Sequence, residues 1–265
     1  MFQIKKPQGH LQNSATTINI TDYMSKTLCL DFGNTRLKIA LFENASLKEM
    51  IILNASPFEH LKEIIEQHQP SVSILSSVVN HDMQIEELLK SKTQCHKLDS
   101  HSKLPFTIPV GKPETVGADR LAIAAASVYL FPKKNNLVIG LGSCITYNFI
   151  NQSNELLGGA ISPGMEMRFK AMHQYTAKLP MAEADWNVPL IGYDTKTNLQ
   201  TGVVLGIAKE IDGMIDAYNQ KFGNFNAVLT GGDIAIFRSH LKNKIFADPD
   251  LIFKGLYAIS QINRA

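Results

Sequence analysis

Residues 27–44 read TLCLDFGNTRLKIALFEN, and residues 136–150 read NLVIGLGSCITYNFI. Each stretch is a short hydrophobic run, a turn that carries glycine and hydroxyl residues, and a second β-rich run. This pattern predicts a β-hairpin in both places. Because each hairpin opens one half of the chain, the sequence predicts a duplicated α/β architecture with a ligand bound between the halves.

The residues after each hairpin continue the pattern. After the first hairpin we expect strands at 48–53 and 72–79 and helices at 60–69 and 83–91. After the second we expect strands at 155–162 and 226–233 and helices at 165–179 and 197–223. The composition turns polar near 132–136, so the sequence predicts one half over 26–134 and another over 135–265. Residues 1–25 are polar and weakly periodic, which predicts an N-terminal extension before the folded body.

The amino-acid composition limits the classes of partner that the protein can have. The 265 residues are 45% hydrophobic and carry a net charge of +2, so the chain can bury one large core or two modest ones. This balance lacks the basic excess of a nucleic-acid-binding protein, and no apolar run reaches transmembrane length. We therefore expect neither nucleic acid nor membrane as a partner. Three cysteines without metal-type spacing fit a reducing, cytoplasmic location.

The turn of the first hairpin has groups that suit a phosphate. Gly33 lets the backbone come close to an anion, and Asn34 and Thr35 add donors. Asp31 at the strand end is placed to hold Mg²⁺ through water, and Lys38 to neutralise phosphate charge. A plain hairpin whose Asp, Gly and Asn only form the turn explains the spacing too, and spacing alone favours it.

Two further segments are candidates. Gly117 and Ala118 precede Asp119 and Arg120 at the start of an alanine-rich helix, where a carboxylate is suited to accept a proton and a guanidinium to grip an anion. The alternative is that Asp119 caps the helix and Arg120 lies at the surface. Gly231 and Gly232 in the run 230–233 follow an apolar strand, as an adenosine pocket requires, although a plain turn explains them nearly as well.

Other catalytic motifs are missing from the sequence. It contains no GxxxxGK[ST] motif, no GxGxxG before a helix, no HExxH and no GxSxG. P-loop, Rossmann, zincin and hydrolase-elbow chemistry are thereby excluded.

In combination and in this order, the motifs resemble type III pantothenate kinase over residues 27–262. They are Asp31 to Lys38, SSVV at 76–79, Gly117 to Arg120, GGAISPG at 158–164, and Thr230 to Asp233. The resemblance implies a duplicated ribonuclease-H-like fold of the actin, sugar-kinase and heat-shock ATPase superfamily, with ATP between two α/β subdomains. It also implies a homodimer that phosphorylates pantothenate at its primary hydroxyl, the first committed step of coenzyme A synthesis.

Site residues follow motif by motif. The implied ATP- and phosphate-binding residues are Asp31, Phe32, Gly33, Asn34, Thr35, Arg36, Leu37, Lys38, Gly142, Ser143, Gly231 and Gly232. The implied pantothenate contacts are Gly117, Ala118, Asp119, Arg120 and Thr195, with Asp119 as the proton acceptor and Mg²⁺ or a similar divalent ion near Asp31. The segment of Thr195, TKTNLQTG, departs from the family's usual T-x-x-A-M-Q-S-G.

The second hairpin also departs from the family. The usual Asp-x-Gly-Thr-Ala-x-Thr-x-Asp is replaced by GLGSCITYN at 140–148, so neutral Gly140 and Asn148 stand where the family has acids. The first of these acids is associated with a monovalent cation, K⁺ or NH₄⁺, and Gly140 has no side-chain oxygen to bind one. Three interpretations stay open: activity with less dependence on potassium, activity with a cation held by carbonyls and a neighbouring subunit, or a degraded member with a binding role. Rival functions are a nucleotide-responsive accessory protein and an exopolyphosphatase-like phosphatase.

Overall fold

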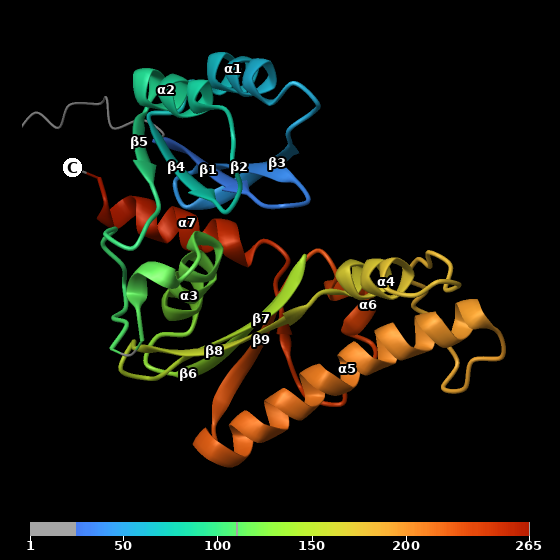
Figure 1. Ribbon diagram of the computed structural model, residues 1–265. Helices are drawn as coiled ribbons and strands as arrows, with labels where there is room; N and C mark the ends of the chain where they lie inside the picture. Colours follow the sequence, from blue (N-terminus) through green and yellow to red (C-terminus); the bar gives the residue numbers. More distant parts are fainter. Residues whose placement is uncertain (1–24, 110, 265) are drawn as a thin grey trace, which may run out of the picture.

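The computed structural model describes residues 25–109 and 111–264 (Figure 1). The predicted N-terminal extension, apart from residue 25, lies outside the described residues. Within the described ranges, none of the helices combines the length and the apolar character that crossing a membrane requires.

The first half is a five-stranded sheet in the order β3-β2-β1-β4-β5. Its strands are β1 (Lys26–Phe32), β2 (Leu37–Glu43), β3 (Ser46–Ile52), β4 (Val72–Ser77) and β5 (Gln94–Lys97). Strands β1, β2 and β3 are antiparallel, whereas β4 and β5 run parallel to β1. Helices α1 (Pro57–His68) and α2 (Met83–Lys92) cover its outer face, where Leu28, Leu30 and Phe32 pack against their apolar side chains.

The second half repeats this plan in a sheet of order β10-β9-β6-β7-β8. Its strands are β6 (Asn135–Leu141), β7 (Cys144–Ile150), β8 (Leu156–Pro163), β9 (Phe225–Gly231) and β10 (Phe246–Ala247). The outer face carries α4 (Met165–Gln174), the long α5 (Thr195–Phe222) and the short α6 (Ile234–Phe237). If the strands of each half are numbered along the chain, both sheets have the same order of third, second, first, fourth and fifth strand. The second sheet is read from β8 and the first from β3. The predicted duplicated ribonuclease-H-like fold is therefore confirmed.

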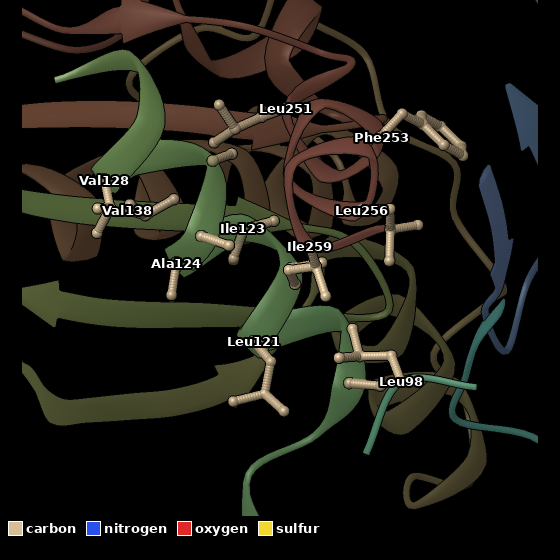
Figure 2. Close-up of a cluster of buried hydrophobic side chains, with 14 of the residues drawn as sticks. Leu98, Leu121, Ile123, Ala124, Val128, Val138, Leu251, Phe253, Leu256 and Ile259 are labelled. Carbon is tan, nitrogen blue, oxygen red and sulfur yellow. The ribbon is translucent and has the colours of Figure 1, made fainter. Parts of the chain in front are cut away.

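Two helices lie between the sheets: α3 (Ala118–Leu130), which follows the short 3₁₀ turn η1 (Pro113–Thr115), and α7 (Leu251–Ile262). One buried cluster joins both helices to side chains from both sheets. Figure 2 shows its members on α3 and α7, together with Val138 of β6. The helices touch closely at Gly255, where an added Cβ would lie 1.8 Å from the carbonyl oxygen of Ala122. The predicted division at residues 134 and 135 falls between α3 and β6, but α7 returns from the second half to pack on β1 and β4.

Candidate active site

Strand alternation decides which side chains face the helices between the sheets. In β1, Leu28 and Leu30 pack on the outer face, so Cys29 and Asp31 point to the inner one. In β7, Tyr147 and Phe149 pack toward α5, so Thr146 and Asn148 face α3. The inner faces thus bring polar groups from both sheets to the start of α3.

The first hairpin divides its predicted site residues into two groups. Asn34, Thr35 and Arg36 are exposed at the turn, which Gly33 closes by donating its amide to the carbonyl oxygen of Arg36 over 3.2 Å. The Phe32 side chain is 0% exposed and meets the ring of His81 edge to face. Leu37 packs against the same buried cluster as Phe32. Phe32 and Leu37 can therefore offer a ligand little beyond their backbone.

The turns of the two hairpins meet. The hydroxyl oxygens of Thr35 and Ser143 lie 2.9 Å apart, at hydrogen-bonding distance, although 108 residues separate them in the chain. Behind Ser143, its carbonyl oxygen accepts the amide of Gly164 over 3.1 Å, which sets the N-terminus of α4 against the hairpin. Gly142 closes the turn by donating to the carbonyl oxygen of Cys144 over 3.1 Å. Both predicted phosphate turns thus border one space.

The charge of Asp119 acts on Asp31 from a different element. Burial raises the pKa of Asp31 to about 6, Lys38 opposes this shift, and the charge of Asp119 adds to it. Lys38 is the register partner of Asp31 across the hairpin. Within the described ranges, no group of three His, Cys, Asp or Glu side chains could hold a metal ion. A divalent ion near Asp31 would therefore take most of its ligands from water and phosphate oxygens, which suits Mg²⁺.

Asp119 is the second residue of α3, and the helix begins from Gly117 as its N-cap without a side-chain cap. The interpretation of Asp119 as the capping residue is therefore wrong. An added Cβ on Gly117 would lie 2.5 Å from Oδ1 of Asp119, so glycine leaves room for this carboxylate. Among the residues that the structure describes, no hydrogen bond engages the Asp119 carboxylate. No described residue therefore occupies this carboxylate.

Arg120 reaches across to the second sheet. Its Nε donates to Oδ1 of Asn148 over 2.7 Å, and its side chain is partly buried rather than at the surface, as the alternative had it. Burial lowers the pKa of Arg120, while Asp119 and Tyr218 oppose that shift. Asn148 is therefore a site neighbour that the motifs did not assign.

Gly140 does not provide a cation site. An added Cβ would lie 2.8 Å from Oγ1 of Thr146, its cross-strand partner, and 3.6 Å from Cδ1 of Ile123. A hydroxyl and a methyl group fill the place that an acidic side chain would take. The residues present do not fit a monovalent cation bound by a side chain at this position.

The Gly-Gly turn at the end of β9 lies beside the second hairpin. Gly231 has a φ of +108°, and its added Cβ would lie 2.1 Å from the carbonyl oxygen of Leu141, so close backbone packing alone requires glycine here. The Cβ position of Gly232 is open. Burial raises the pKa of Asp233, Glu166 adds to this shift and Arg36 opposes it. The charge of Arg36 in the first half thus acts on Asp233 in the second.

Thr195 is not brought together with the other site residues. It begins α5 and lines a cavity of about 330 Å³ with Met172, Leu179 and Leu199. Tyr218, which influences Arg120, lies 23 residues further along the same helix, a distance of about 35 Å at 1.5 Å per residue. Within one chain, Thr195 and Arg120 cannot contact the same small molecule.

Comparison with known proteins identifies the family. A sequence model described as type III pantothenate kinase matches residues 27–217. The type III pantothenate kinase of Christiangramia forsetii is 39% identical over 89% of this chain and 98% of its own length. That of Flavobacterium johnsoniae is 39% identical over 86% of this chain and 95% of its own.

A solved structure supports the fold. A conserved protein of Campylobacter jejuni, assigned to the Baf family of transcriptional activators, is 22% identical over 89% of this chain and 98% of its own, with a TM-score of 0.56. This likeness bears on the fold alone. The sequence matches to the two kinases, in contrast, extend over nearly the whole length of each relative. The chain belongs to the type III pantothenate kinase family.

Proposed function

We propose that this chain transfers the γ-phosphoryl group of ATP to the primary hydroxyl of pantothenate, the first step of coenzyme A synthesis. The observation that carries this proposal is the unengaged carboxylate of Asp119 at the start of α3, electrostatically coupled to Asp31 at the base of the first hairpin. Kinase chemistry needs this arrangement, in which a proton acceptor faces a phosphate-binding turn.

The roles divide by position. ATP binds between subdomains 26–134 and 135–265, with its phosphates against Gly33, Asn34 and Thr35 of one turn and Gly142 and Ser143 of the other. Gly231 and Gly232 border the adenosine, and Arg36 and Lys38 balance phosphate charge. Because phosphoryl transfer depends on positioning and charge stabilisation, these backbone and hydroxyl donors are the groups that the reaction requires.

Asp119 orients the pantothenate hydroxyl and accepts its proton, and Arg120 binds the anionic end of the substrate. Gly117 and Ala118 shape this side of the pocket. Asp31 binds Mg²⁺ through water, and the ion neutralises charge on the phosphates when bound. Neutral Gly140 and the packed Thr146 argue for activity that does not depend on a monovalent cation.

The functional unit is a homodimer, in which Thr195 completes the pantothenate pocket of the partner. Two observations support this: the length of α5 between Thr195 and Tyr218, and the exposed apolar side chains in the segment 175–193 that precedes Thr195. They are Tyr175, Met181, Trp186, Leu190, Ile191 and Tyr193.

Subunit mixing tests the shared site. Asp119→Asn and Thr195→Val homodimers should each be weak, whereas re-equilibrated mixtures should recover activity, because mixed dimers contain one site with both defects and one intact site. No recovery from a mixture shown to contain mixed dimers would place Thr195 outside the shared pocket.

A coupled assay of ADP release, with and without pantothenate, tests the reaction itself. The expected result is ADP formation that requires pantothenate and yields a product heavier by one phosphoryl group in mass spectrometry. Pantothenate or ATP binding without turnover would favour the accessory protein, and phosphate release from polyphosphate would favour the phosphatase. The three unpaired cysteines, Cys29, Cys95 and Cys144, are compatible with the cytoplasmic location that we propose.

A further inference from the structure

Arg120 is held at one point. Within residues 25–109 and 111–264, its hydrogen bond to Asn148 runs through Nε, and its two terminal nitrogens make none. A guanidinium fixed through Nε keeps its terminal N–H groups free for an anion, and their direction follows from the position of the Nε acceptor. The residue that accepts the hydrogen bond from Nε therefore sets the direction in which the terminal N–H groups point.

Asn148 is itself fixed. Its side chain is 0% exposed, and its Nδ2 donates to the carbonyl oxygen of Val138 over 3.3 Å and to Oγ1 of Thr146 over 3.2 Å. The carbonyl oxygen of Val138 can only accept, so it requires the amide nitrogen on its side, and the Thr146 hydroxyl accepts from the same nitrogen. A flipped amide would aim N–H groups at the Nε–H of Arg120 and leave a carbonyl oxygen buried against Val138. This leaves one orientation for the amide, with Oδ1 toward Arg120.

Thr146 connects this pair to the altered second hairpin. The same Oγ1 that accepts from Asn148 occupies the space beside the Cα of Gly140. Hydrogen bonds thus run from Thr146 through Asn148 to Arg120. Of the two positions where the resemblance leads one to expect acids, Asn148 is part of this chain and Gly140 lies beside it. An amide acceptor orients the guanidinium without neutralising its charge, whereas a carboxylate would compete with an anionic substrate.

We propose that Asn148 is the positioning residue for Arg120, and that it aims the guanidinium at the carboxylate of pantothenate. This inference rests on the proposed function. Asn148 acts through Arg120 and makes no contact with the substrate itself. Its loss should therefore weaken pantothenate binding and leave ATP binding unchanged.

The experiment measures KM for pantothenate and for ATP, and kcat, in Asn148→Ala, Arg120→Ala and the double variant. Asn148→Ala should raise KM for pantothenate about tenfold or more, the scale of a lost hydrogen bond to a charged group, and leave KM for ATP within about twofold. In the Arg120→Ala background, Asn148→Ala should have no further effect, because its action passes through the removed side chain.

Two further variants separate positioning from folding. Asn148→Asp keeps an acceptor for Nε but partly neutralises the guanidinium, so its affinity for pantothenate should lie between those of the wild type and Asn148→Ala. Asn136→Ala removes an equally buried asparagine of β6, which donates to the carbonyl oxygens of Phe131 and Lys134 and accepts from Asn226. It should lower thermal stability and leave both KM values unchanged. If Asn148→Ala does not fold, Asn148→Leu, of similar volume, replaces it with the same expectations.

Failure of this inference and failure of the proposed function give different results. A wild-type protein that shows no pantothenate-dependent turnover would contradict the function. Turnover by the wild type, with an unchanged KM for pantothenate in the variant or with effects that add in the double variant, would contradict the role of Asn148 alone.

Discussion

Thr35 of the first hairpin and Ser143 of the second lie 2.9 Å apart, hydroxyl to hydroxyl, and join the turns of two separate sheets. Each turn belongs to its own half of a duplicated fold, so this contact marks where the halves meet over the proposed phosphate site. A phosphate between the turns would exchange this hydroxyl pair for two hydrogen bonds to anionic oxygens, which are the stronger kind.

The hydroxyl pair predicts an effect on ATP binding. Thr35→Val and Ser143→Ala should each raise KM for ATP about tenfold, the scale of one hydrogen bond to a charged group, and leave KM for pantothenate nearly unchanged. Steady-state kinetics with each substrate varied separately measure this split. Ser91→Ala is the matched control, because within the described part of the chain the Ser91 side chain on α2 bonds only to the carbonyl oxygen of Leu88. A rise in KM for pantothenate instead would assign the turns to the other substrate.

Removal of the proposed base predicts a loss of turnover. Asp119→Asn keeps the size of the side chain and removes its ability to accept a proton, so kcat should fall by roughly 10² or more. Asp82→Asn, at the exposed start of α2, should retain wild-type kcat even where it weakens the helix cap. An unchanged kcat in Asp119→Asn would remove Asp119 from this role.

Substitution of Gly117 should lower kcat by displacing the carboxylate of Asp119. The methyl group of Gly117→Ala would overlap the carboxylate, since the Cβ position lies 2.5 Å from Oδ1, so kcat should fall although no polar group is lost. Gly213→Ala on α5 meets open space and should raise the free energy of unfolding by about 0.5–1 kcal/mol without altering kcat. Equal kcat values for both variants would show that Asp119 tolerates displacement.

Asp31 predicts a pH-dependent stability, measured without nucleotide or metal ion. Its pKa rises from 3.8 to about 6 in the folded protein, so folding favours the protonated carboxyl. Stability is therefore lost as pH rises through this window, and the loss is complete above it. Asp31→Asn avoids the buried charge and should be more stable than wild type at pH 8 by on the order of 2 kcal/mol.

The difference between Asp31→Asn and wild type should fade below about pH 4, where both states of the wild-type carboxyl are protonated. Urea unfolding at both pH values measures it. A difference that does not change with pH would show that Asp31 stays solvated in the folded protein.

Gly140 predicts independence of monovalent cations. Replacement of K⁺ or NH₄⁺ by choline at constant ionic strength should change the rate less than about twofold, because Thr146 and Ile123 fill the space of an acidic ligand. Gly140→Asp should destabilise the fold rather than create a potassium requirement. A rate that collapses in choline would show that backbone carbonyls or a second subunit bind the ion.

Much of the fold could be predicted from the sequence because its signals are local. Both hairpins, α1, α2 and the buried strand β4 follow from alternation and helical periodicity. The predicted helix at 165–179 was too long, since α4 ends at Gln174. Helix α7 was not predicted from its largely apolar sequence, because only packing against α3 and two sheets makes it a helix with a defined place.

The candidate site also contains residues that the sequence identified and one whose role only the structure revealed. The order of the motifs named Asp31, Asp119 and Arg120 through the family resemblance, because residue type and spacing taken singly also fit a plain hairpin turn and a helix cap. No sequence signal assigned Asn148 a partner, because its bond to Arg120 joins residues 28 positions apart on different elements. The neutral amide of Asn148, at a position where the resemblance implies an acid, was the one available indication.

The sequence by itself determined the duplicated fold, the two turns and the acidic and basic groups, because periodicity and turn chemistry act between near neighbours. Only the tertiary structure decided which groups meet. It set Thr35 against Ser143 and Arg120 on Asn148, filled the place beside Gly140, and separated Thr195 from Arg120 by the length of α5. These relationships depend on how two sheets pack around α3 and α7, and long-range packing leaves no period in the chain.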